Sequence, residues 1–96
     1  MIDEQLAMRA AQAFSEATRK KLPSARTEIQ DGGLFLLLSV EVPSSEKSAV
    51  KQLMRAEVAH KLNSILPANE GQTVGSWLVI FTHEGEVYDS ILPYGV

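Results

Sequence analysis

The tetrapeptide His83-Glu84-Gly85-Glu86 places the residue types of a reaction centre within four positions. An imidazole can act as a general base, and a carboxylate beside it can orient the ring or bind a metal ion. Successive residues of an extended chain point to opposite faces, however, so His83 and Glu84 do not converge on one atom. Gly85 has the left-handed freedom that a hairpin bend needs after a type I turn. The pattern therefore predicts a hairpin turn with no catalytic residues.

The second histidine, His60, follows Glu57 by three residues within a stretch of helical periodicity. That spacing makes the two side chains neighbours on one helix. One histidine and one carboxylate are too few ligands for a metal site, because at least one more is required. We expect a solvated histidine on the outer or flanking side of the helix, with no metal ion and no other cofactor.

Motifs of other chemistries are missing from the sequence. The chain has no cysteine, which excludes disulfides and thiolate chemistry. It contains no nucleophile elbow, phosphate-binding loop or dinucleotide-binding glycine pattern. Its one basic cluster does not favour nucleic-acid binding, because it lacks adjacent aromatic residues and lies on a net acidic chain. That cluster consists of Arg19, Lys20, Lys21 and Arg26.

Aromatic side chains are the remaining candidates for a binding site, since Trp and Tyr are enriched at interface hot spots. Core packing competes with that role, because a small protein needs its large residues inside. The apolar residues Phe35 and Leu37 also lie opposite the expected core face of their strand. The candidate interface or ligand residues are Phe35, Leu37, Trp77, Tyr88 and Tyr94.

Composition and charge narrow the class of protein. With 96 residues, 45% of them apolar and 22% charged, we expect one globular α+β domain spanning residues 1–96. The absence of cysteine favours a reducing compartment, so we expect a cytoplasmic location. The longest apolar run, Leu34 to Leu38, has five residues, whereas a membrane helix needs about 20. The N-terminal segment lacks the basic start and apolar run of a signal peptide.

The net charge of −3 is unevenly distributed. All nine Lys and Arg residues lie between Arg9 and Lys61, against eight acidic residues up to position 66. Four acidic residues and no Lys or Arg follow from Pro67 onward, so the C-terminal third carries −4. Such a segment favours basic partners, or it is a solvated edge that maintains solubility.

Periodicity predicts two helices. Residues Ile2 to Leu22 carry apolar side chains at intervals of three and four, and Pro23 follows. A second helix is expected from Pro43-Ser44-Ser45 to about Leu66, with a serine hydroxyl as its N-terminal cap. Its expected buried stripe consists of Val50, Leu53, Met54, Val58, Leu62 and Ile65.

Two hairpins complete the expected order α-β-β-α-β-β. The first covers Ala25 to Val42, and Asp31-Gly32-Gly33 provides the positive φ of its turn. The second joins Val74–Thr82 to Glu86–Leu92. Alternation predicts a core face on the second strand. It consists of Leu34, Leu36, Leu38, Val40 and Val42. The third strand is apolar on both sides, so its buried face stays open at this point.

These elements predict a two-layer α+β sandwich with a four-stranded, mainly antiparallel sheet and two helices on one face. Because two helices cover only one side, the apolar residues on the other side need a partner. We expect a non-catalytic interaction or regulatory module, homodimeric through that sheet face. A basic protein partner would fit the acidic C-terminal third. One alternative is a small-molecule-binding protein in which aromatic residues line a pocket for an apolar ligand at the sheet or dimer interface. The other is an enzyme whose site residues are too dispersed along the sequence to recognise.

Overall fold

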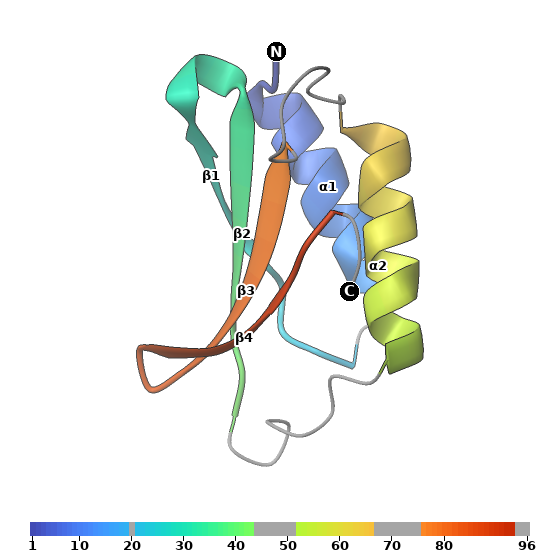
Figure 1. Cartoon of the computed structure of the whole chain (residues 1–96), viewed down its shortest axis with the longest axis vertical. Helices are drawn as coiled ribbons and strands as arrows, with labels where there is room; N and C mark the ends of the chain where they lie inside the picture. Colours follow the sequence, from blue (N-terminus) through green and yellow to red (C-terminus); the bar gives the residue numbers. More distant parts are fainter. Residues whose placement is uncertain (20, 44–51, 67–75, 94–96) are drawn as a thin grey trace.

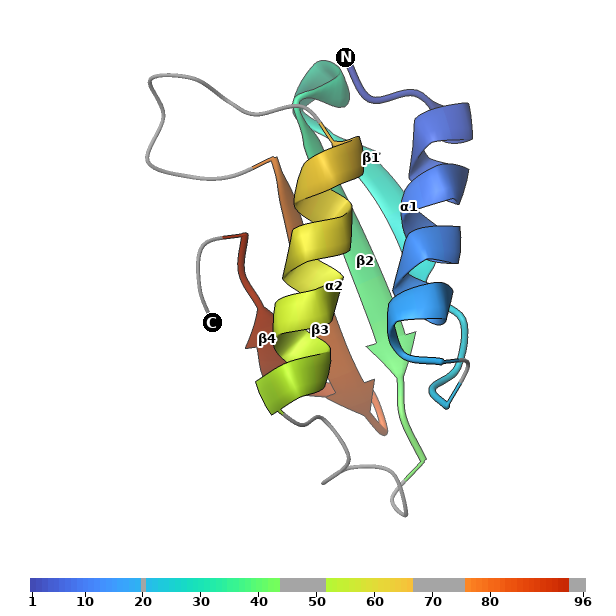
Figure 2. The same cartoon turned by 90° about the vertical axis from the view of Figure 1, so that its right-hand side faces the viewer.

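The computed structural model describes residues 1–19, 21–43, 52–66 and 76–93. Both helices lie on one face of a four-stranded sheet with the order β1-β2-β3-β4 (Figures 1 and 2). The elements are α1 (Glu4–Ala17), β1 (Arg26–Gln30), the 3₁₀ turn η1 (Asp31–Gly33), β2 (Phe35–Glu41), α2 (Gln52–Ile65), β3 (Trp77–His83) and β4 (Glu86–Ile91). The predicted α+β sandwich and its element order are confirmed.

The sheet is mixed, because its two central strands are parallel. β1 and β2 form one antiparallel hairpin and β3 and β4 form the other, but β2 pairs with β3 in parallel. Parallel neighbours need a long crossover connection, and the chain between Glu41 and Trp77 includes α2. The expectation of a mainly antiparallel sheet therefore holds for the two hairpins and not for the central pair.

Helix α1 is capped by Asp3, whose carboxylate accepts a hydrogen bond of 2.8 Å from the Leu6 amide. The helix ends at Ala17, five residues before the predicted end at Leu22. The Thr18 hydroxyl donates to the Phe14 carbonyl at 3.0 Å within the core. Arg19 then takes a left-handed φ of 56°, which ends the helix well before Pro23.

Helix α2 packs on the same face of the sheet as α1. Val58 and Leu62 are completely buried, and Met54 and Ile65 pack partly against the core. The predicted serine cap and Val50 lie outside the described residues. The side chain of Leu53 also lies outside what the structure describes. Neither described helix has the length and apolar character needed to cross a membrane.

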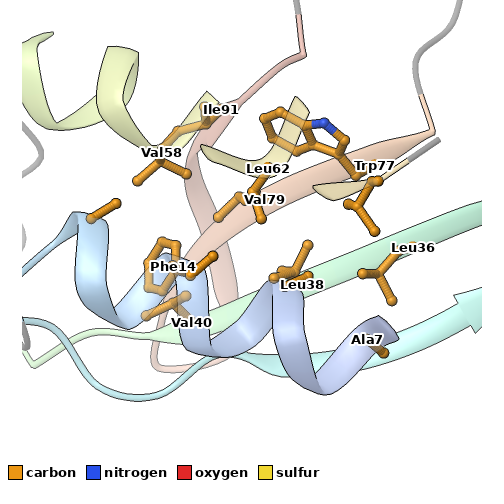
Figure 3. Packing of buried hydrophobic residues seen from close by; sticks show 14 of the residues in the cluster. Ala7, Phe14, Leu36, Leu38, Val40, Val58, Leu62, Trp77, Val79 and Ile91 are labelled. Carbon is orange, nitrogen blue, oxygen red and sulfur yellow. The ribbon is translucent and has the colours of Figure 1, made fainter. Parts of the chain in front are cut away.

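The core lies between the helices and one face of the sheet (Figure 3). Alternate residues of β2 and β3 point into it, and Phe14 of α1 lies 6.2 Å from Phe81, measured between ring centroids. The completely or almost completely buried strand residues are Leu36, Leu38, Val40, Val42, Trp77, Val79, Phe81 and Ile91. The predicted core face of β2 is therefore confirmed, except at Leu34. That residue is 52% exposed because it ends the 3₁₀ turn with φ −88° and ψ −14°, outside the strand's alternation.

Polar side chains of α2 attach the second hairpin to the helix layer. The Arg55 guanidinium forms an ion pair of 2.8 Å with Asp89 and donates to the Ser90 carbonyl. The Asn63 side chain accepts from the Trp77 indole N–H at 2.9 Å and donates to the Pro93 carbonyl at 2.8 Å. These contacts hold β4 and the following residues against α2.

The turn between β1 and β2 also holds the N-terminal residues in place. Asp31, Gly32 and Gly33 have φ values of 54°, 64° and 95°, as the sequence predicts. The Gly33 carbonyl accepts a hydrogen bond of 2.8 Å from the Ile2 amide. A Cβ atom at Gly33 would lie 3.1 Å from the Met1 Cε and 3.2 Å from the Ile2 carbonyl oxygen, whereas Gly32 has open space around it. Gly33 is thus restricted both by its backbone conformation and by its neighbours.

We predict that Gly33→Ala destabilises the protein more than Gly32→Ala. Both variants place a Cβ at positive φ, a strain of about 1–3 kcal/mol, but only Gly33→Ala also crowds residues 1 and 2, which brings the expected loss to about 2–4 kcal/mol. Urea denaturation of the two variants measures the difference. Equal midpoints would show that the N-terminal residues do not pack on this turn.

Candidate functional site

The sheet face opposite the helices carries a contiguous set of apolar side chains. The parallel register places Leu37 beside Leu78 and Ser39 beside Ile80, and Phe35 shares this face with Leu37. All four apolar residues are partly exposed. We call the set of Phe35, Leu37, Leu78 and Ile80 the open face, because both described helices pack on the other side (Figure 2).

Polar and charged residues border the open face. On β1, Arg26, Glu28 and Gln30 point to the same side of the sheet, since they pair with Ser39, Leu37 and Phe35 of β2. The Gln30 amide donates to the Glu28 carboxylate at 2.8 Å. An apolar centre with a polar rim is the usual composition of a protein–protein contact surface.

The side of the sheet that carries the open face is mainly polar near the β3–β4 turn, although the exposed Val87 pairs with Thr82 there. A hollow of about 420 Å³ lies there, lined by Arg26, Ser39, Glu41, Thr82 and Gly85. The Thr82 hydroxyl donates to one oxygen of the Glu41 carboxylate, and the Glu84 amide donates to the other at 2.7 Å. These contacts join the end of β2 to the turn and fix the Glu41 side chain in the rim.

The pKa of Glu41 lies below its usual value of 4.5 because the charged carboxylate accepts these hydrogen bonds. The Thr82 hydroxyl has the largest effect, desolvation opposes it, and the amides of Glu84 and Gly85 lower the pKa further. A lowered pKa in the folded state stabilises the fold above the unfolded-state value near 4.5. That contribution disappears as the pH falls through the folded-state pKa.

The predicted turn at the tetrapeptide 83–86 is confirmed, and it uses two residues. β3 ends at His83, β4 begins at Glu86, and both Glu84 and Gly85 have positive φ, at 51° and 83°. Positive φ at both positions is characteristic of a type I′ turn, so the expected type I turn followed by a left-handed glycine is wrong. The right-handed twist of the paired strands favours the primed turn.

The His83 ring joins the end of β3 to Val42, the residue that follows β2. Its Nδ1 lies 2.7 Å from the Val42 carbonyl oxygen, to which it donates. Its Nε2 is 3.9 Å from the Glu84 carboxylate, whose side chain is 86% exposed. Because one ring nitrogen is engaged with the backbone and the other lies beside an exposed carboxylate of the same turn, this arrangement is that of a structural hairpin contact. His60, by comparison, is exposed on α2, and the residues described by the structure contain no group of three potential metal ligands.

The candidate residues proposed from sequence separate onto two sides of the sheet. Phe35 and Leu37 lie on the open face. Trp77 is only 1% exposed and packs beneath α2, as Figure 3 shows. Tyr88 also packs partly against the core, with its ring centroid 6.4 Å from that of Phe81, and burial raises its pKa. Tyr94 lies outside the described residues.

Leu78 and Ile80 complete the open face, although they were not among the sequence-derived candidates. Alternation placed them on one side of β3, but it did not indicate which side was buried. The deciding factor is size: Trp77 and Phe81 fill the space under the helices, which leaves Leu78 and Ile80 on the opposite side. Burial of the largest aromatic residues is therefore the signal that would have identified them.

Neither a protein-family model, nor a curated protein, nor a solved structure matches this chain.

We predict that Thr82→Val raises the pKa of the Glu41 carboxyl group towards 4.5, because it removes the strongest hydrogen bond to the charged form. Ser39→Ala is the matched control, since Ser39 lines the same hollow without a hydrogen bond to Glu41. A pH titration followed by the NMR signal of the side-chain carboxyl carbon measures both. An unchanged midpoint in Thr82→Val would contradict the assigned role of the hydroxyl.

Proposed function

We propose that this protein is a non-catalytic interaction module that forms a homodimer through the open face. The observation that carries the proposal is the adjacency of Phe35, Leu37, Leu78 and Ile80 on the side of the sheet opposite the helices. Scattered apolar residues on a surface are ordinary, whereas a contiguous patch bordered by polar residues usually marks a contact site. A second copy is the simplest partner that brings a complementary patch of the same kind.

The size of the open face supports a weak dimer. Four strands spaced about 4.8 Å apart, with about 3.3 Å per residue over seven residues, span roughly 19 Å by 23 Å, or about 440 Å² in projection. This projected area covers all four strands and is below the ~800 Å² per partner of a standard interface. The apolar residues are already partly buried in the single copy, so each gains less than the ~1.5–3 kcal/mol of full burial. We therefore expect dissociation in the micromolar range.

The charges on the rim favour one orientation of the two copies. A two-fold axis parallel to the strands would place Leu37 against Leu78 of the partner subunit, because both residues occupy the same row of the sheet. Ser39 would then meet the partner's Ile80. The other possible axis lies parallel to the plane of the sheet, crosses the strands at right angles and follows the row of Glu28, Leu37 and Leu78. It would place Glu28 opposite Glu28 of the partner subunit, and like charges repel. The first arrangement is the one we propose.

The aromatic-pocket alternative has less support. A pocket at the sheet or dimer interface would require Phe35, Trp77 and Tyr88 to approach one another. Trp77 is buried between the sheet and α2, and Phe35 lies on the opposite side of the sheet. The aromatic side chains that the sequence suggests for such a pocket therefore do not share a surface.

We predict that Leu37→Asp converts the dimer to the 10.5 kDa monomer without unfolding it. The added charge would be desolvated in the contact, while the helix-facing side of β2 remains intact. Gln12→Asp, at an exposed position of α1, adds the same charge away from the open face and should remain dimeric. Sedimentation equilibrium from about 5 to 200 μM measures the mass, and circular dichroism checks the fold.

A wild-type protein that sediments as a 10.5 kDa monomer over this whole concentration range would refute the homodimer. Equal dissociation of both Asp variants would also contradict the proposal, because it would locate the contact elsewhere or attribute the effect to net charge.

A further inference from the structure

The outer edge of β1 is a second surface that the fold leaves unpaired. β1 pairs with β2 along one edge. Within the described parts of the chain, no hydrogen bond joins the backbone of its other edge to another element. Figure 1 shows β1 as the terminal strand of the sheet. The opposite terminal strand differs, because Arg55 of α2 binds the Ser90 carbonyl of β4.

A hollow of about 360 Å³ lies beside this edge, between α1 and β1. Thr27 and Ile29 of β1 and Ala7 and Met8 of α1 line it, together with Glu4. Met8 is 71% exposed, so its side chain is accessible to a partner at this hollow. The hollow therefore has a mixed lining, polar from Glu4 and Thr27 and apolar from Ala7, Met8 and Ile29, beside the edge of β1 that does not pair with β2.

Exposed carboxylates lie near the end of this edge where β1 meets the turn to β2. Glu28 lies on β1 itself, and Asp31 follows in the turn. The hydrogen bond from the Ile2 amide to Gly33 holds the start of α1, with Asp3 and Glu4, next to the same turn. Arg26, at the beginning of β1, is the single basic residue of that strand. The local charge is therefore negative.

We propose that β1 and the adjoining hollow accept an extended basic segment of a partner protein as a fifth strand. Strand addition gains affinity from backbone hydrogen bonds and specificity from pockets that take alternate side chains. One set of side chains would enter the hollow beside Thr27 and Ile29, which favours apolar residues such as valine. The alternate set would lie beside Glu28 on the other side of the sheet, which favours lysine or arginine.

Charge selects this occupant over a second copy of the chain. Antiparallel pairing of two β1 strands centred on Glu28, the register that pairs all five residues, would oppose the two Glu28 side chains, and like charges directly across a sheet are destabilising. The other terminal strand, β4, carries Glu86 and Asp89 and would add further negative charge. A dimer formed through the open face leaves the β1 edge accessible, so the two proposals stand independently.

The test uses the full-length ¹⁵N-labelled protein and the synthetic peptide acetyl-Lys-Val-Lys-Val-Lys-amide. We expect saturable shifts of the β1 amide signals and slower hydrogen exchange in β1, with β4 unaffected. The same peptide with Glu in place of Lys should bind at least about tenfold more weakly, because like charges oppose its approach. Perturbations centred away from β1 and the hollow, or no binding at millimolar peptide, would overturn the proposal.

Two further comparisons separate strand addition from simple charge attraction. N-methylation at alternate positions removes the N–H donors from one backbone edge of the peptide, so two complementary versions each block a different edge. The version blocked on the edge that faces β1 should lose binding, and the other version should keep it. Glu28→Lys should weaken binding at least tenfold, whereas Glu57→Lys, an equal charge change on exposed α2, should leave it nearly unchanged. Equal binding of both methylated peptides, or equal effects of both substitutions, would show a non-specific electrostatic contact and overturn the proposal.

Discussion

The parallel pairing of β2 with β3 is the constraint on which the rest of the architecture depends. Two parallel neighbours require the chain to cross from one end of the sheet to the other, and α2 lies in that crossover. The helix joins α1 on one side of the sheet, so the buried core forms there. Each central strand is flanked on its outer side by the other strand of its own hairpin, which gives the order β1-β2-β3-β4.

The size of Trp77 and Phe81 determines which side of the sheet faces the helices. The helix-facing side takes the large residues, including Trp77, Phe81 and Leu38, and α2 satisfies the Trp77 indole through Asn63. The opposite side has the apolar residues Phe35, Leu37, Leu78 and Ile80 in its centre and charged or hydroxyl-bearing residues at its border. This arrangement is an interior on one side and a partly exposed apolar patch on the other, which is the physical basis for the proposed homodimer.

The two proposed surfaces differ in what they would recognise. The open face offers apolar area and little net charge at its centre, which suits another copy of the same surface. The edge of β1 offers unpaired backbone groups, a hollow with both polar and apolar lining residues, and several carboxylates, which suit an extended basic segment. If both proposed surfaces are used, each dimer presents two peptide-binding edges, one from the β1 strand of each copy. The acidic character of the chain is consistent with a basic partner at the β1 edge.

Local patterns in the sequence predict most of the elements, because periodicity and turn residues report on each segment alone. The alternation of β2 identifies Leu36, Leu38 and Val40 as core residues, and glycines mark both hairpin turns. The parallel central pair is not encoded in any one segment, since it depends on how a crossover returns the chain. The buried side of β3 is likewise decided by competition for volume, because both of its sides are apolar. Leu34 shows the limit of alternation, as its turn conformation interrupts the strand.

The most direct test of the central claim is an isotope-filtered NOESY experiment on a dimer that mixes ¹³C-methyl-labelled and unlabelled copies. The account predicts intermolecular contacts between the Leu37 methyl groups and the methyl groups of Leu78 of the partner subunit, with further contacts at Phe35 and Ile80. Intermolecular contacts confined to the helices or to a strand edge would contradict it. So would a complete absence of such contacts together with full accessibility of Leu37 and Leu78 to a soluble paramagnetic probe.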